Sequence, residues 1–204
     1  MKRMLTFGIL FSVLAGGYLL FFTGNTPIKN YPSSGSDIVA FGDSLVFGVG
    51  ATPGSDFVSV LGREIGVPIV NLGKSGDTTL DGLARLEEVT GYDAKIVLLL
   101  FGGNDYIRKI PTEETFVNLG TMIQEIQSTG AIVVLLGVRG GVLVDGYDDD
   151  FEALAEKYQT AYVSNVLDGL FDRPKYMSDT IHPNDAGYAR IADRVFEQIK
   201  DLLE

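Results

Sequence analysis

Five short apolar runs divide most of the chain, and most of them end at glycine or a polar residue. Their length is that of a strand rather than of a helix. Because polar positions do not alternate within them, they are typical of strands covered on both faces of a parallel sheet. The predicted strands are residues 38–41, 68–72, 95–101, 131–137 and 161–163.

The segments between these runs carry apolar residues at helical spacing instead. Residues 55–66 show it clearly, with Ser55 as the expected N-cap and Gly66 as the stop. Further helices are expected from Thr78 or Thr79 (burying Leu80, Leu83, Leu86 and Val89), over residues 112–129, from residue 148 and from about Asn184. The alternation predicts an α/β fold, a three-layer α/β/α flavodoxin-like sandwich with a mainly parallel, doubly wound sheet of about five strands.

The N-terminus has a different pattern from the rest of the chain. Lys2 and Arg3 precede an uncharged apolar stretch, residues 4–22, whose length is close to the roughly 20 residues that cross a bilayer. Residues 1–24 are therefore expected to be a removed signal peptide or a retained membrane anchor. Retention is favoured, because residues 18–22 remain apolar beyond the small residues that a cleavage site would use.

A polar segment containing Pro, Ser and Gly follows, and residues 25–36 are expected to be a linker. The domain is then expected over residues 37–204. The positive charges at the start of the chain are expected to stay in the cytoplasm, which predicts that the domain is exported. We expect it to be anchored to the cytoplasmic membrane by the N-terminal helix, or to be periplasmic or secreted if that helix is cleaved.

Composition excludes several kinds of site and partner. The 204 residues contain no cysteine, which rules out disulfides, thiolate metal sites and a cysteine nucleophile. Without Lys2, Arg3 and Lys29, the exported part has 13 basic and 27 acidic residues, a net charge near −14. This charge argues against nucleic acid as a partner and against electrostatic binding to an anionic lipid surface.

Polar and glycine residues collect where the first three predicted strands end. Asp43 and Ser44 follow the first strand, residues 73–77 the second and residues 102–105 the third. The carboxyl ends of parallel strands share one edge of the sheet, and helices that begin there point free N–H groups at it. Ser44 is therefore either a reactive group in a pocket suited to negative charge or a cap for the next helix.

His182 is the single histidine of the chain, and Asp179 lies three residues before it. A carboxylate on one imidazole nitrogen fixes the tautomer and leaves the other nitrogen to accept a serine proton. If an imidazole activates a serine here, it must be that of His182. Its position after an acid, before Pro183 and at the start of a helix favours this role over simple packing.

Other motifs fail on inspection. Residues 73–75 lack the upstream glycine of a phosphate loop, because that position is Pro68. A dinucleotide fingerprint over residues 48–53 ends in Pro53 instead of glycine, and no serine lies in a Gly-x-Ser-x-Gly elbow. A metal site would need side chains that here lack ligand spacing, namely Asp43, Asp105, Asp179 and His182. Neither a metal nor a cofactor is expected.

Four blocks of the sequence resemble the GDSL, or SGNH, hydrolase family, and together they span nearly all of residues 38–190. They are Gly42-Asp43-Ser44-Leu45, the block from Asn71 to Asp77, Gly102-Gly103-Asn104-Asp105, and Asp179-Thr180-Ile181-His182-Pro183. Residues 75–79 and 82–86 are especially similar to the bacterial exported branch of thioesterases, lysophospholipases and arylesterases.

The resemblance implies a role for each of five residues. Ser44 is expected to be the nucleophile, His182 its general base and Asp179 the acid that orients the histidine. The oxyanion hole is expected to consist of the Ser44 and Gly76 backbone N–H groups and the Asn104 side-chain amide. Position along the chain does not separate Gly76 from the other glycines of its loop, so this choice follows the family.

The resemblance also implies a serine esterase that hydrolyses small-molecule or lipid acyl esters or thioesters through an acyl-enzyme. Two alternatives are an O-acetyl esterase acting on carbohydrate or cell-envelope polymers, and a catalytically inactive, tethered binding domain. Phe47, Tyr106, Val142 and Leu143 are expected near the substrate and favour longer acyl chains, with core packing as the other interpretation. The loop over residues 138–144 differs from that of relatives, and the sequence indicates no oligomeric state.

Overall fold

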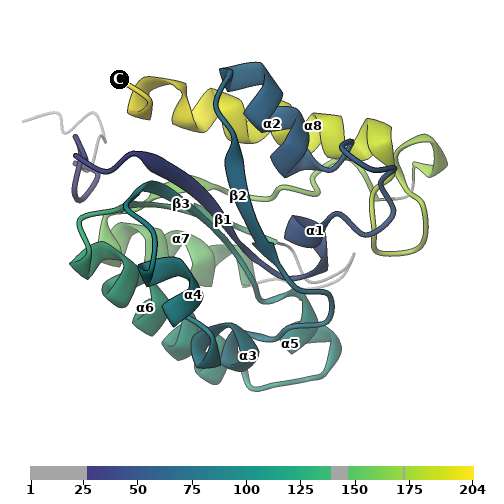
Figure 1. Ribbon diagram of the computed structural model, residues 1–204. Helices are drawn as coiled ribbons and strands as arrows, with labels where there is room; N and C mark the ends of the chain where they lie inside the picture. Colours follow the sequence, from purple (N-terminus) through teal and green to yellow (C-terminus); the bar gives the residue numbers. More distant parts are fainter. Residues whose placement is uncertain (1–26, 139–146, 172) are drawn as a thin grey trace, which may run out of the picture.

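The computed structural model describes residues 27–138, 147–171 and 173–204. Its five strands form one parallel sheet in the order β2-β1-β3-β4-β5 (Figure 1). They are β1 (Asp37–Gly42), β2 (Ile69–Gly73), β3 (Ala94–Leu100), β4 (Ile132–Leu136) and β5 (Ala161–Val163). This is the flavodoxin-like order, so the predicted fold class is confirmed.

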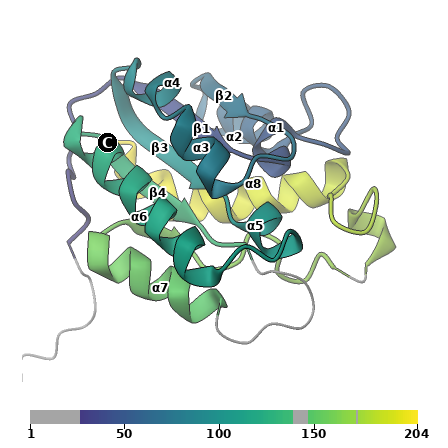
Figure 2. The ribbon, with the colours of Figure 1, turned by 90° about the horizontal axis from the view of Figure 1, so that it is seen from below.

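Helices cover both faces of the sheet. Figures 1 and 2 show α2 and α8 packed together on one face, and α3, α4, α6 and α7 on the other. The helices are α1 (Ser44–Phe47), α2 (Phe57–Ile65), α3 (Thr79–Ala84), α4 (Glu87–Thr90), α5 (Gly103–Ile107), α6 (Thr112–Ser128), α7 (Tyr147–Tyr158) and α8 (Asp185–Ile199). Two short 3-10 turns, η1 (Pro174–Tyr176) and η2 (Lys200–Leu202), flank α8.

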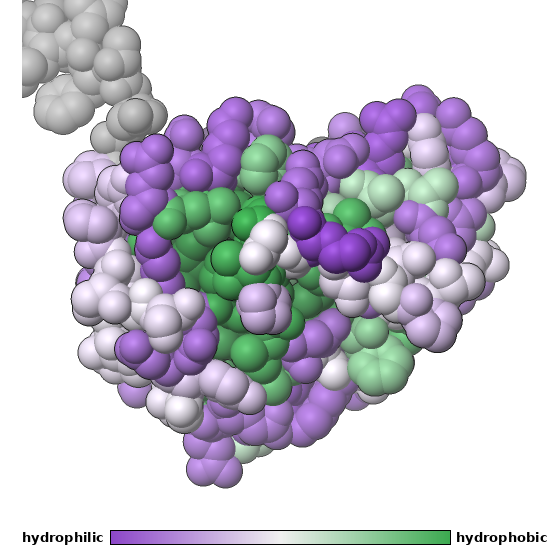
Figure 3. Space-filling view, turned by 45° about the horizontal axis from the view of Figure 1, so that its top comes forward, coloured by the Kyte–Doolittle hydropathy of each residue, from purple (hydrophilic) through white to green (hydrophobic). Residues whose placement is uncertain are grey.

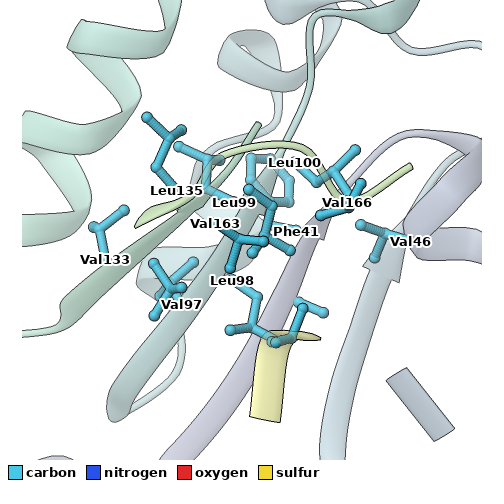
Figure 4. Close-up of a cluster of buried hydrophobic side chains, with 14 of the residues drawn as sticks. Phe41, Val46, Val97, Leu98, Leu99, Leu100, Val133, Leu135, Val163 and Val166 are labelled. Carbon is cyan, nitrogen blue, oxygen red and sulfur yellow. The ribbon is translucent and has the colours of Figure 1, made fainter. Parts of the chain in front are cut away.

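The hydrophobic core lies between the sheet and its helices. Every residue of β4 is fully buried, as are the last five residues of β3. Burial on both faces explains why these strands lack polar positions. Figure 4 shows part of the core, with Phe41, Val46, Val97, Leu98, Leu99, Leu100, Val133, Leu135, Val163 and Val166 labelled.

The structure corrects two details of the helix predictions. The N-cap of α2 is Asp56 rather than Ser55, and its carboxylate accepts the Ser59 N–H at 2.9 Å. The single helix expected after Thr78 is two, because α3 ends at Ala84 and α4 begins at Glu87. Leu80, expected on the buried side, is 54% exposed, since α3 turns this side chain to solvent.

The predicted anchor over residues 1–24 lies outside the described residues. None of the described helices combines the length and apolar character that a membrane span requires. The described part of the predicted linker is hydrogen-bonded to the domain. The side-chain amide of Asn30 donates to the carbonyls of Gln127 and Ala131 at 2.8 and 2.9 Å.

Candidate active site

The strand order places the site at the position where the winding of the sheet reverses. β2 lies on one side of β1, and β3, β4 and β5 lie on the other. Gly42 pairs in register with Gly73 of β2 and with Leu100 of β3. The loops that follow these three strands therefore begin level with one another, at the edge where parallel α/β sheets bind ligands.

Ser44 is the first residue of α1, directly after the loop that leaves β1. The N-cap is Asp43, whose side chain accepts the Leu45 N–H at 2.9 Å, so the capping role left open for Ser44 belongs to its neighbour. The Ser44 N–H, at the first helical position, has no intrahelical acceptor. Its hydroxyl oxygen lies 3.0 Å from Nε2 of His182.

The loop before α8 brings His182 and Asp179 together. His182 Nδ1 lies 2.8 Å from Asp179 Oδ2, and Asp179 Oδ1 accepts the backbone N–H groups of Ile181 and His182 at 2.8 and 2.7 Å. Asn184 then caps α8 by accepting the Ala186 and Gly187 N–H groups. The acid, the imidazole and the helix start are thus fixed in one continuous turn.

Burial and hydrogen bonding act in opposite directions on Asp179. Burial, the largest single influence, acts to raise the pKa of its carboxyl group. The hydrogen bonds from the His182 ring and from the N–H groups of Ile181 and His182 together hold this pKa below its ordinary value. Asp179 is therefore a carboxylate at neutral pH, which suits a group that orients an imidazole.

The two other predicted oxyanion donors come from neighbouring loops. The Asn104 side-chain amide, in α5, donates to the Asp77 carbonyl at 2.9 Å, and its second N–H remains for another acceptor. Gly76 has a φ of 87°, in the left-handed region that favours glycine, and its carbonyl accepts a hydrogen bond from Arg108. Asn104 lines the cavity described below with Ser44, whereas Gly76 is not among the lining residues.

A cavity of about 740 Å³ opens beside the serine and the histidine. Most of its wall is apolar. Hydrophobic residues are also exposed on the face of the molecule that Figure 3 shows. Ile107 and Ile181 are 56% and 42% exposed on the cavity wall. The other large apolar lining residues are Leu45, Tyr106, Val138, Leu167, Phe171, Pro174 and Met177.

The residues predicted near the substrate have different positions. Tyr106 lines the cavity. Phe47 does not, and its side chain is 59% exposed. Val142 and Leu143 lie outside the described residues.

Sequence reasoning did not identify the part of the wall formed between β5 and η1, which includes Leu167 and Phe171. Its signal was available, because apolar residues lie between the last predicted strand and the loop that contains Asp179 and His182.

The sequence did not indicate that the carboxyl group of Asp43 is buried. Asp43 is 2% exposed and lines the cavity next to Ser44. Burial raises the pKa of its carboxyl group to about 7, and the nearby carboxylates of Asp105 and Asp77 act in the same direction. Within residues 27–138, 147–171 and 173–204, no group of three or more acidic or histidine side chains is arranged to hold a metal ion.

Comparison with known proteins places the chain in one family. The family model described as the GDSL-like Lipase/Acylhydrolase family matches residues 40–190. The chain is 29% identical over 178 residues to Esterase TesA of Pseudomonas aeruginosa, covering 81% of this chain and 89% of that protein.

It is also 26% identical over 175 residues to Thioesterase 1/protease 1/lysophospholipase L1 of Escherichia coli K12, covering 81% of this chain and 84% of that protein. The crystal structure of TesA superposes with a TM-score of 0.77 and 28% identity, covering 82% of this chain and 99% of that one. The described fold and the matched residues agree, and the chain belongs to the GDSL-like lipase/acylhydrolase family.

Proposed function

We propose that this protein is a serine esterase that hydrolyses acyl esters or thioesters through an acyl-enzyme, with Ser44, His182 and Asp179 as its catalytic triad. One observation carries the proposal. The Ser44 hydroxyl lies 3.0 Å from one nitrogen of His182, and Asp179 lies 2.8 Å from the other. This arrangement activates a serine in unrelated folds, and the family of the chain supports the same chemistry.

In the first half-reaction, the Ser44 oxygen bonds to the ester carbonyl carbon as its proton moves to Nε2 of His182. Asp179, on Nδ1, holds the ring in the required tautomer and stabilises the imidazolium that forms. Collapse of the tetrahedral intermediate breaks the bond to the leaving oxygen or sulfur, which takes the proton from His182. A water molecule then repeats these steps on the acyl-enzyme, releasing the acid and restoring Ser44.

Negative charge on the former carbonyl oxygen needs donors in place before the reaction. We assign these donors to the N–H groups of Ser44 and Gly76 and to the side-chain amide of Asn104. The position of Ser44 at the start of α1 and the free N–H of Asn104 support the assignment. The hydrogen bond between Asn104 and the Asp77 carbonyl holds the amide next to the loop that contains Gly76.

The cavity supports an acyl chain rather than an acetyl group as the part of the substrate beside Ser44. Its volume of about 740 Å³ is within the range for drug-sized ligands, and its wall is mostly apolar. The relative named Thioesterase 1/protease 1/lysophospholipase L1 supports acyl thioesters and lysophospholipids as substrates to test. An O-acetyl esterase remains the second candidate, because the same chemistry would serve it.

The location of the enzyme is proposed on the sequence alone. Lys2, Arg3 and the apolar residues 4–22 support export of the domain, with residues 1–24 as a retained anchor or a cleaved signal peptide. Cell fractionation followed by N-terminal sequencing of the mature protein tests this. An intact N-terminus in the membrane fraction supports the anchor, a new N-terminus near residue 25 supports cleavage, and a cytoplasmic protein contradicts export.

Replacing Ser44 by alanine tests the mechanism. Ser44→Ala should lower kcat on p-nitrophenyl esters by at least about 10³-fold, because no other group forms the acyl-enzyme. Unfolding by urea should be nearly unchanged, since only one oxygen atom is removed. A serine-directed fluorophosphonate should label the wild type and not the variant. Wild-type activity in Ser44→Ala would exclude the assignment.

Replacing Asn104 by alanine tests the oxyanion hole separately. The loss should be about 3 kcal/mol of transition-state stabilisation, seen as a fall in kcat of roughly 10²-fold or more. A loss below about twofold would remove Asn104 from the oxyanion hole. A profile of activity against acyl length then separates the two substrate classes, because an O-acetyl esterase should fail beyond very short chains.

A further inference from the structure

Arg85 lies at the C-terminal end of α3, in a sequence block to which the proposed mechanism gives no role. Its side chain is 10% exposed, and its guanidinium lies 4.4 Å from the ring centroid of Phe41. Arg85 is not among the residues that line the cavity. Any influence of Arg85 on the reaction must therefore pass through other residues.

The guanidinium joins the ends of two neighbouring strands. Nη2 donates to the Gly42 carbonyl at 2.9 Å, and Nη1 donates to the Leu72 carbonyl at 3.0 Å. Nε donates to the Asp77 carboxylate at 2.6 Å. The planar fork of arginine reaches these three acceptors from one position, whereas the ammonium of lysine is a single point with three donors on a flexible stem.

The first of these contacts fixes the chain beside the nucleophile. Gly42 is the last residue of β1, and Ser44 follows two residues later. The Gly42 carbonyl also accepts the Lys74 N–H at 3.0 Å, so it ties β1 to the loop after β2. A shift of Gly42 would therefore move the start of α1 and with it the N–H and hydroxyl of Ser44.

The contact with Asp77 fixes the other two proposed oxyanion donors. Asp77 follows Gly76 directly, and its own carbonyl accepts the Asn104 amide at 2.9 Å. Its carboxylate forms an ion pair with Arg85, and the side chains of Arg85 and Asp77 are 10% and 17% exposed. Arg85 therefore contacts the residue that connects Gly76 to Asn104.

We propose that Arg85 is a positioning residue that aligns the three oxyanion donors with one another. The inference rests on the proposed function, because it assumes that these donors stabilise an oxyanion. The residue touches no reacting atom, and its effect comes from holding the chain next to each donor. Since a displacement of about 1 Å in a catalytic group can cost roughly 10²-fold in rate, the loss of this alignment should be measurable in kcat.

The test is the variant Arg85→Lys, which keeps the charge and loses the fork. We expect kcat on a p-nitrophenyl ester to fall by roughly 10- to 100-fold with KM changed by less than about threefold. Titration of the active sites with a fluorophosphonate counts the reactive serines. Dividing the maximal rate by this count gives a kcat that a loss of folded protein does not lower. A kcat within about twofold of the wild type would overturn the proposal.

Two further variants separate positioning from stability. Asn30→Gly removes two side-chain hydrogen bonds to backbone carbonyls at the opposite edge of the sheet and keeps a residue suited to the φ of 65° there. It should lower the melting temperature and leave kcat per site unchanged. If Arg85→Lys does not fold, Asp77→Asn replaces it, because it removes the ion pair and keeps the backbone. A fall in kcat of roughly threefold or more supports the proposal, and no fall overturns it.

The double variant Arg85→Lys/Asn104→Ala gives a readout that a purely structural role would not produce. If Arg85 acts through the oxyanion donors, the double variant should lose less than the product of the two single losses, because Asn104 can no longer be misaligned whereas the N–H groups of Ser44 and Gly76 still can. If the two losses multiply, Arg85 acts independently of Asn104 and the proposal is overturned. Failure of the proposed function would look different, because the wild type itself would then hydrolyse no ester.

Discussion

The carboxyl group of Asp43 is buried in the wall of the cavity beside Ser44. One of its oxygens accepts the Leu45 N–H at 2.9 Å, which fixes the start of α1. Burial raises its pKa from 3.8 to about 7, with Asp105 and Asp77 adding to the rise. In the unfolded chain the group ionises near its ordinary value, so the folded and unfolded states bind different numbers of protons between about pH 4 and pH 7.

This difference predicts a loss of stability with rising pH. Because the pKa of Asp43 is raised in the folded state, this group adds to the free energy of unfolding. The contribution is complete below pH 3.8 and is lost as the pH rises through about 7. The shift of about three units corresponds to about 4 kcal/mol. Asp43→Asn keeps a capping side chain and cannot ionise. The free energy of unfolding of the wild type, minus that of Asp43→Asn, should fall by this order between pH 4 and pH 8 in urea titrations.

Parallel pH curves for the two proteins would contradict this prediction, because they would mean that Asp43 titrates alike in both states. The contribution of Asp179 to stability depends on pH in the opposite direction, since hydrogen bonds lower its pKa in the folded state. Its contribution is present above the ordinary pKa and is lost as the pH falls through the folded value. The two aspartates next to Ser44 and His182 therefore respond to pH in opposite directions.

Individual residues differ in how far the sequence predicts them. The contact between Asp179 and His182 is predictable, because the two lie three residues apart before a helix and the histidine is the only one. The contact of Ser44 with that pair follows from the family resemblance. Arg85 and Asp43 could not be found this way. Their surroundings depend on carbonyls and carboxylates that meet only when separate strands lie side by side.

Among the elements, the strands are predicted more closely than the helices. β3 and β4 are runs of apolar side chains that are buried on both faces almost throughout, so their pattern survives folding. β2 is only partly buried, but it is still an apolar run of strand length. The helix expected after Thr78 fails because spacing alone does not show where a helix ends. α3 stops at Ala84, and the side chain of Arg85 turns inward to the strand ends, whereas Leu80 remains in solvent.

The first turn of α8 packs directly on η1 and thereby positions the loop that contains Asp179 and His182. A Cβ at Gly187 would lie 2.2 Å from the Tyr176 carbonyl oxygen and 2.7 Å from the Pro183 side chain. Real Cβ contacts are not that short, so any side chain at this position would push the helix away from the turn. The loop between them joins the two elements and would move with them.

Gly187→Ala should therefore destabilise the protein by about 3 kcal/mol, since overpacking against backbone cannot be relieved by a rotamer change. It should also lower kcat, because His182 would shift relative to Ser44. Gly91→Ala is the matched control, with a Cβ 3.6 Å from the nearest oxygen and a negative φ. It should be neutral within about 0.5 kcal/mol or slightly stabilising. Equal urea midpoints for the two variants would contradict the predicted close contact.

The cavity beside Ser44 and His182 and the described N-terminal segment lie at opposite ends of the sheet. Figure 1 shows the start of the described chain on the far side of β1 from α1 and α5. Asn30 and Ser33 of this segment donate to carbonyls just before β4, at the amino ends of the strands, namely those of Gln127, Gly130 and Ala131. Contacts there can affect stability without reaching the cavity.

Comparison of fragments 27–204 and 37–204 tests this separation. Removing residues 27–36 deletes the side-chain hydrogen bonds of Asn30, Tyr31 and Ser33 to backbone carbonyls. At about 1 kcal/mol or less for each, the loss should be about 3 kcal/mol, or roughly 6 to 12 °C in melting temperature. The value of kcat at 25 °C should stay within about twofold. Equal melting temperatures would mean that residues 27–36 are a passive linker, as their composition predicts, whereas the expected loss would make them part of the folded domain.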